Sequence, residues 1–153
     1  MTPGNGKGLG PRLGTAGALA LALLAAGCAE KPRAALDSVS FTVAPAANDT
    51  TPVAIDLVSV RDKALVDKLG ALTAAEWFGQ REQSMRDHPT TLGVTSWELV
   101  PGQTLKTDLP PGEPAWAILI FANYSTPGPH RLRVPDTRTL TLTAGDKDVE
   151  LVP

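Results

Sequence analysis

Residues 115–124 read AWAILIFANY, and this run decides how the rest of the chain can fold. Apolar side chains occupy both alternating sets of positions, whereas a strand with one solvated face alternates apolar and polar residues. Turn-forming residues, STPGP at 125–129, follow it directly. We therefore expect a strand that is buried on both faces and lies centrally in a sheet.

Seven further segments have the pattern of half-buried strands. Each alternates apolar and polar residues, and each is bounded by turn residues such as proline, glycine, asparagine or aspartate. Eight short strands without parallel crossover helices predict an all-β fold, a β-sandwich. The seven segments are residues 38–44, 53–60, 95–100, 103–109, 130–134, 138–144 and 147–152.

Residues 62–88 break this pattern and predict a short helical insertion. Thr73 and Glu76 have the spacing of a capping box, in which the two side chains satisfy free N–H groups at a helix start. A helix from about 74 to 86 is expected, because Pro89 cannot continue it.

Four aromatic residues could serve either packing or ligand binding. Trp77 and Phe78 could line a ligand groove, but we favour a structural role in which they let the helix cover an open end of the sandwich. Trp97 and Trp116 lie within predicted strands, where buried aromatic rings contribute large apolar area to a small core. Packing is the preferred interpretation for all four.

The N-terminus has the order of a secretory signal. Lys7 and Arg12 precede a short apolar run at 13–26, which ends at Gly27 and the sole cysteine, Cys28. The run is shorter than the roughly 18–20 residues that a membrane-spanning helix needs. The sequence LAAGC resembles the lipobox of bacterial lipoproteins, in which the cysteine is acylated. We therefore expect a signal peptide at 1–27 and lipid attachment, palmitate included, at Cys28; a buried cysteine after a cleaved secretory signal is the alternative.

Residues 28–37 contain alanine, charged residues and Pro32, and we interpret them as a lipidated tether. The domain itself is expected at 38–153. In lipoproteins resembling this one, an aspartate after the cysteine is the signal for retention in the inner membrane. Ala29 stands there instead, so the resemblance implies sorting to the outer membrane.

Little in the sequence indicates catalysis, a metal site or a cofactor. One cysteine excludes an intramolecular disulfide and a cysteine-based zinc cluster. The sequence has no glycine-rich phosphate loop, no histidines at metal-ligand spacing and no Gly-x-Ser-x-Gly motif. His88 and His130 are expected to be exposed loop residues. A formal net charge of −2 and scattered basic residues argue against nucleic acid.

The acids at Asp146, Asp148 and Glu150 alternate along a predicted hairpin. They could suggest a calcium site. A solvated strand edge is the better interpretation, because carboxylates there also discourage edge-to-edge aggregation.

The order of these features resembles the TssJ family, the outer-membrane lipoproteins of the type VI secretion system. An Asn-containing loop, with Ala47, Asn48 and Asp49, precedes PVAIDLVSVRD at 52–62. Further along the chain, WELVPGQ at 97–103 and AILIFANY at 117–124 look like two later family elements.

The resemblance implies a transthyretin-like sandwich of two four-stranded sheets. It also implies a partner, the periplasmic part of the inner-membrane TssM subunit, beside other subunits of the type VI membrane complex. In the family this partner is contacted through the loop between the first two strands. That loop is 45–52 here, and its candidate binding residues are Ala46, Ala47, Asn48, Asp49, Thr50 and Thr51.

The expected function is therefore mechanical. Acylated Cys28 would hold the domain on the periplasmic face of the outer membrane while the 45–52 loop binds the TssM-like protein. The alternative is a lipid-anchored sandwich that binds carbohydrate or peptide and has no part in secretion. An enzyme is the weakest interpretation.

Overall fold

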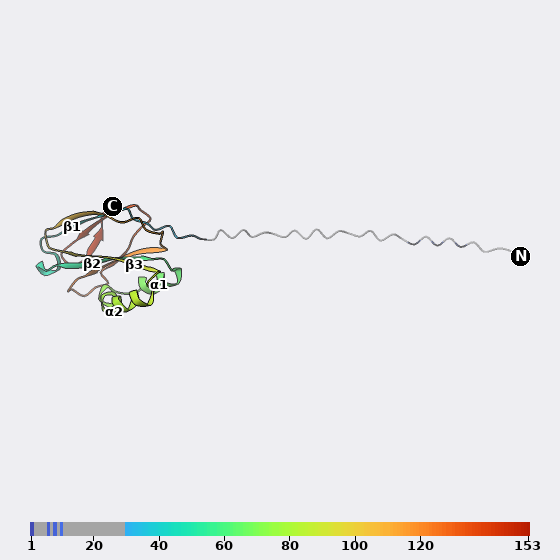
Figure 1. Ribbon diagram of the computed structural model, residues 1–153, viewed down its shortest axis with the longest axis horizontal. Coiled ribbons are helices and arrows are strands. Elements are labelled where there is room, and N and C mark those ends of the chain that lie inside the picture. Colours follow the sequence, from blue (N-terminus) through green and yellow to red (C-terminus); the bar gives the residue numbers. More distant parts are fainter. Residues whose placement is uncertain (2–5, 7, 9, 11–29) are drawn as a thin grey trace.

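The computed structural model describes residues 30–153, together with residues 1, 6, 8 and 10 (Figure 1). Most of the predicted signal peptide at 1–27, and both Cys28 and Ala29, lie outside the described residues.

Within residues 30–153, eight strands form two four-stranded sheets, so the predicted sandwich is confirmed. One sheet has the order β4-β1-β7-β8 and the other β3-β2-β5-β6. Neighbouring strands are antiparallel except for β1 and β7, which pair in parallel. The strands are β1 (Ser38–Val43), β2 (Val53–Val60), β3 (Leu92–Leu99), β4 (Thr104–Asp108), β5 (Ala117–Asn123), β6 (Arg131–Arg133), β7 (Thr139–Ala144) and β8 (Val149–Leu151).

Strand β5 is central in its sheet and buried on both faces, as its apolar run predicts. It pairs with β2 on one side and β6 on the other. Ile118 and Ile120 point into the core between the sheets, whereas Leu119 and Phe121 belong to a second apolar cluster on the outer face. Both faces of this strand are therefore removed from water, which accounts for the absence of alternation.

Two helices pack on the strands and contribute the remaining residues of that outer cluster. Helix α1 (Lys63–Gly70) and helix α2 (Ala74–Asp87) follow one another between β2 and β3. The predicted capping box starts α2: the Thr73 N–H donates to Glu76 Oε2 at 2.7 Å, and the Glu76 N–H donates to Thr73 Oγ1 at 3.2 Å. The bond from the Thr73 N–H, and then one from the Thr73 hydroxyl at 2.9 Å, stabilise the Glu76 carboxylate and hold its pKa below its ordinary value. None of the helices in the described part of the chain is long and apolar enough to span a membrane.

The helices cover the outer face of the β3-β2-β5-β6 sheet, so the prediction that α2 closes an open end of the sandwich is wrong (Figure 1). Trp77 is fully buried and stacks on Phe121 of β5, with ring centroids 5.1 Å apart. Val58 and Val60 of β2 lie in the same cluster. The outer face of this sheet carries apolar side chains, and the two helices shield them from water.

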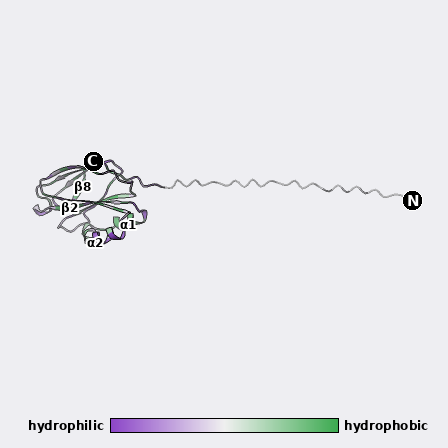
Figure 2. Ribbon diagram, in the orientation of Figure 1, coloured by the Kyte–Doolittle hydropathy of each residue, from purple (hydrophilic) through white to green (hydrophobic). Residues whose placement is uncertain are grey.

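Most of α2 is hydrophilic (Figure 2), and only Ala74 and Trp77 in it are buried. A polar contact adds to this small apolar area. Asp56 of β2 is 1% exposed and accepts hydrogen bonds from Trp77 Nε1 at 2.8 Å and from Ser96 Oγ at 2.6 Å. Arg81, one turn further along α2, lies 3.4 Å from the same carboxylate. The helix is thus held on the sheet by this buried acid as well as by the stacked rings of Trp77 and Phe121.

The other two tryptophans also pack, in different ways. Trp97 lies on β3 and its ring centroid is 5.1 Å from that of Phe41 in the core. Trp116 does not lie within a strand, so that prediction is wrong. It directly precedes β5 and is half-buried. Lys63 Nζ lies over it, 5.0 Å from the ring centroid.

The domain begins earlier than the boundary at 38 that the sequence suggests. The Arg33 and Ala34 N–H groups donate to the Ala115 carbonyl at 3.1 and 3.0 Å. The Asp37 N–H donates to the Arg138 carbonyl at 2.7 Å, and Leu36 is buried at 9% exposure. Residues 33–37, expected to belong to the tether, are therefore part of the sandwich.

Candidate functional site

One end of the sandwich gathers four connections between strands, and we call it the loop end. It consists of residues 45–52, 100–103, 124–130 and 145–148, which lie between β1 and β2, β3 and β4, β5 and β6, and β7 and β8. The strand registers bring them together, since Val43 pairs with Ala144 and Val53 with Leu99. The segment that enters the domain lies at the opposite end, where Ser38 pairs with Asp108 and Thr139.

The 45–52 loop has an unusual backbone. A short 3₁₀ turn at Ala47–Thr50 contains Asn48, Asp49 and Thr50 with φ of 49°, 55° and 62°. Left-handed backbone costs an L-residue about 1–2 kcal/mol, and only asparagine and aspartate tolerate it at all readily. For a β-branched residue such as Thr50 it is a true outlier. Three such residues in succession persist only where surrounding contacts hold them.

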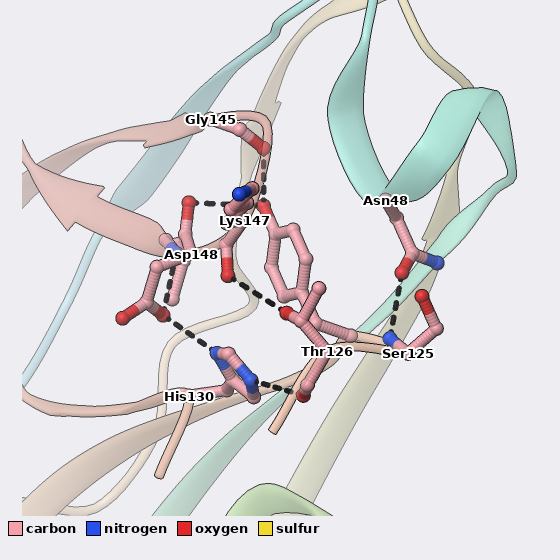
Figure 3. A network of polar contacts seen from close by, with 9 residues as sticks. Asn48, Ser125, Thr126, His130, Gly145, Lys147 and Asp148 are labelled. Carbon is pink, nitrogen blue, oxygen red and sulfur yellow. Dashed lines mark hydrogen bonds and ion pairs between the residues drawn. The ribbon is translucent and has the colours of Figure 1, made fainter. Parts of the chain in front are cut away.

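Asn48 supplies those contacts (Figure 3). Its side chain, on a residue only 5% exposed, accepts from the Ser125 N–H at 2.7 Å and donates to Thr51 Oγ1 at 2.9 Å and to the Pro52 carbonyl at 3.0 Å. Its backbone N–H donates to the Asp146 carbonyl at 2.9 Å. One buried residue thus joins three of the four connections.

The six predicted binding residues divide into two groups. Ala47 and Asn48 are buried at 0% and 5% exposure, so their side chains shape the loop. The other four are exposed and present the surface of the loop to solvent: Ala46, Asp49, Thr50 and Thr51.

His130 is buried, contrary to the expectation of an exposed loop residue. It is 5% exposed and has a left-handed φ of 44°. Its Nδ1 lies 3.0 Å from Asp148 Oδ1, and its Nε2 lies 2.7 Å from the Thr126 carbonyl oxygen (Figure 3). The 145–148 connection contacts this ring through Asp148. No local sequence pattern predicts the burial of His130.

Tyr124 is a second residue that the sequence does not single out. Its hydroxyl lies 2.9 Å from the Gly145 carbonyl oxygen and 3.0 Å from that of Asp148. Burial, and then the negative charge of Asp148, raise the pKa of this phenol well above its ordinary value. Tyr124 therefore stays a neutral donor and fixes the 145–148 turn against the end of β5.

The polar side chains of the loop end are held by hydrogen bonds within the fold. The polar side chains just described hydrogen-bond to one another or to backbone groups, and both ring nitrogens of His130 have partners. Across residues 30–153, no three His, Cys, Asp or Glu side chains are placed to hold a metal ion. All seven aromatic residues lie within that range, and four are buried while Phe78, Trp97 and Trp116 are half-buried.

Comparison with known proteins places the fold. The sequence matches no protein-family model and no curated protein. Among solved structures it is similar to the type VI secretion lipoprotein TssJ1 from Pseudomonas aeruginosa, with a TM-score of 0.57 and 18% identity over 80% of this chain and 96% of that one.

Two further solved structures are similar. A structure of the type VI protein TssM C-terminal domain from EAEC contains a chain that matches with a TM-score of 0.56 and 15% identity, over 76% of this chain and 96% of that one. A type VI membrane complex contains a chain with a TM-score of 0.58 and 15% identity, over 77% and 99%. At these identities the likeness establishes a shared fold.

Proposed function

We propose that this protein is a lipid-anchored outer-membrane lipoprotein of a type VI secretion membrane complex, which tethers the periplasmic part of a TssM-like inner-membrane protein to the outer membrane. The observation that carries the proposal is the sandwich of the TssJ1 fold with a strained, fixed 45–52 loop at the end opposite to its N-terminal entry. The fold is shared with components of that machinery, and the loop is the feature most clearly built for contact.

The arrangement of the two ends fits a bridge. The chain enters the sandwich at 33–37, and the 45–52 loop lies beyond the far ends of β1 and β2. Strand β2 has 8 residues, which at about 3.3 Å each separate the two ends by roughly 26 Å. A lipid at Cys28 would hold one end at the membrane surface while the other end faces into the periplasm.

The anchor would be the acylated Cys28, with Ala29 directing the protein to the outer membrane. Each buried CH₂ of a lipid chain contributes about 0.8 kcal/mol, and stable attachment takes more than one chain. A triacylated cysteine meets that requirement. No transmembrane helix is then needed for a firm hold.

The partner would be bound by the exposed residues of the loop, Ala46, Asp49, Thr50 and Thr51. Binding residues are commonly found on loops that a rigid scaffold positions. A loop already fixed in one conformation loses little conformational freedom on binding, which favours affinity. The contacts of Asn48 supply that fixation here.

Membrane fractionation tests the anchor. We expect Cys28→Ser to give a folded, soluble periplasmic protein and to abolish secretion, whereas the matched variant Ala29→Ser stays in the outer membrane. Ala29→Asp is expected to move the protein to the inner membrane. A Cys28→Ser protein that still fractionates with the outer membrane would overturn the proposal.

Binding to the periplasmic part of the TssM-like protein tests the loop. Ala46 is exposed, and its φ of −101° accepts any side chain, so Ala46→Arg adds bulk without backbone strain. We expect at least tenfold weaker binding and an unchanged unfolding midpoint. The control is Glu113→Arg, an exposed position outside the loop end, which is expected to bind as the wild type does. Equal binding by both variants would remove the loop from the interface.

A further inference from the structure

The geometry points to residues 124–130 as the second half of the partner-binding surface, held against the 45–52 loop as one rigid unit by Asn48 and His130. This inference rests on the proposed function, and it names a surface for which the sequence gives no indication. The partner would then contact two loops that lie far apart in the chain.

Asn48 is the first link between the two loops. Its side-chain oxygen accepts from the backbone N–H of Ser125, a residue 77 positions away, at 2.7 Å. The same side chain fixes the C-terminal part of its own loop through Thr51 and Pro52. Movement of Ser125 relative to the 45–52 loop therefore breaks a part-buried hydrogen bond and leaves the side-chain oxygen of the buried Asn48 unsatisfied, at a cost of about 1–3 kcal/mol.

His130 is the second link, and it fixes the remainder of the 124–130 loop. Its ring bonds the Thr126 carbonyl on one side and Asp148 on the other (Figure 3). Gly128 lies directly against that ring: a Cβ there would come within 2.7 Å of His130 Cε1, far inside contact distance. The Thr126 hydroxyl also donates to the Lys147 carbonyl at 3.3 Å. The loop is thus folded around a buried imidazole.

What this loop leaves exposed is suited to contact. The loop exposes four residues: Ser125, Pro127, Gly128 and Pro129. Its backbone is nevertheless held by the hydrogen bonds of Asn48 and His130. Two prolines restrict the backbone further, so little freedom remains to be lost when a partner binds. Ser125 Oγ lies 3.5 Å from Asp49 Oδ2, which joins the exposed surfaces of the two loops.

The exposed groups indicate the chemistry of the partner. The exposed acceptors include the carboxylates of Asp49 and Asp146 and the hydroxyls of Thr50 and Ser125. Lys147 is the exposed basic residue among 145–148. These groups are mainly acceptors, and the prolines add flat apolar area. A protein surface that carries basic side chains and free N–H donors is complementary to them.

Paired proline variants of the full-length lipidated protein, purified in detergent, test this surface. We expect Pro127→Arg to weaken binding to the periplasmic part of the TssM-like protein at least tenfold, through bulk and through charge repulsion. Pro111→Arg, an exposed proline on the connection before β5, carries the same change and is expected to bind like the wild type. Both variants remove one proline from the unfolded chain, so their unfolding midpoints are expected to match one another.

Hydrogen exchange on the wild-type complex provides a measurement without any substitution. We expect amides of residues 46–51 and 125–130 to become protected together when the partner binds. Protection confined to 46–51, with wild-type affinity in Pro127→Arg and weakened affinity in Ala46→Arg, would overturn this inference and leave the proposed function standing. A wild-type protein that does not bind the TssM-like protein would overturn both.

Discussion

At the scale of single residues, the three consecutive left-handed residues of the 45–52 loop set its shape. Asn48 and Asp49 belong to the residue types that adopt this conformation most readily, but Thr50 does not. Strain of this kind accumulates at functional sites, where the surrounding structure enforces it. The enforcing residue here is Asn48, which is buried, while the strained Thr50 is exposed.

Asn48→Ala and Thr50→Gly are therefore expected to change stability in opposite directions. Asn48→Ala removes three side-chain hydrogen bonds and the tolerance for left-handed backbone, so we expect a loss of about 2–4 kcal/mol in the free energy of unfolding. Thr50→Gly relieves strain but adds freedom to the unfolded chain, and the net gain is expected to be up to about 1 kcal/mol.

Urea denaturation of residues 30–153 measures both effects. A Thr50→Gly protein that is less stable than the wild type by more than 1 kcal/mol would show that the threonine makes contacts that outweigh its strained backbone.

At the scale of elements, the docking of α2 combines a small apolar contact with one buried carboxylate. The helix buries only Ala74 and Trp77, and its inner side meets Asp56 of β2. A buried acid is stable only when it is paired and hydrogen-bonded. The Asp56 carboxylate accepts hydrogen bonds from Trp77 and Arg81 of α2 and from Ser96 of β3. Sheet and helix are thus joined by a polar contact as well as by the stacked rings.

Replacement of Asp56 is expected to loosen that contact strongly. Asp56→Ala leaves the Trp77 N–H without its acceptor and Arg81 with only the exposed Glu82 beside it, and a loss of about 3–5 kcal/mol is expected. Asp56→Asn keeps an acceptor for Trp77 and should lose about 1–3 kcal/mol.

The matched control for this experiment removes the other acid beside Arg81. Glu82 lies 3.4 Å from that guanidinium, but its side chain is 71% exposed, so Glu82→Ala should change the stability by less than about 1 kcal/mol. Equal losses in Asp56→Ala and Glu82→Ala, measured by denaturation, would refute the special role of the buried acid.

At the scale of the whole molecule, the entry segment at 33–37 and the loop end lie at opposite ends of the sandwich. The entry segment is packed on the domain: residues 33–37 hydrogen-bond to Ala115, Leu109 and Arg138, and Leu36 is buried. Before Arg33 the described chain makes one ion pair, between the exposed side chains of Glu30 and Lys63. A lipid-anchored form would thus have a short free tether and a firmly seated domain.

Truncation from the N-terminus tests this boundary. A domain that begins at residue 33 should be as stable as one that begins at 30, within about 1 kcal/mol, because exposed ion pairs contribute little. A domain that begins at 38 loses the burial of Leu36 and several backbone hydrogen bonds, so a loss of about 2–5 kcal/mol is expected. Thermal unfolding followed by circular dichroism measures the difference. Equal midpoints for the domains that begin at 33 and 38 would return residues 33–37 to the tether.

The sequence by itself determined the sandwich, its central strand and the start of α2. Those signals are local in the chain: alternation marks strands, the double apolar face of 117–122 marks burial on both sides, and Thr73 with Glu76 marks a cap. Only the tertiary structure decided that α2 covers a sheet face, that His130 is buried and that Asn48 joins the 45–52 loop to Ser125. Each of these depends on contacts between residues that are distant in sequence, such as Trp77 with Asp56 and His130 with Asp148, and no periodicity within one segment encodes a contact with another.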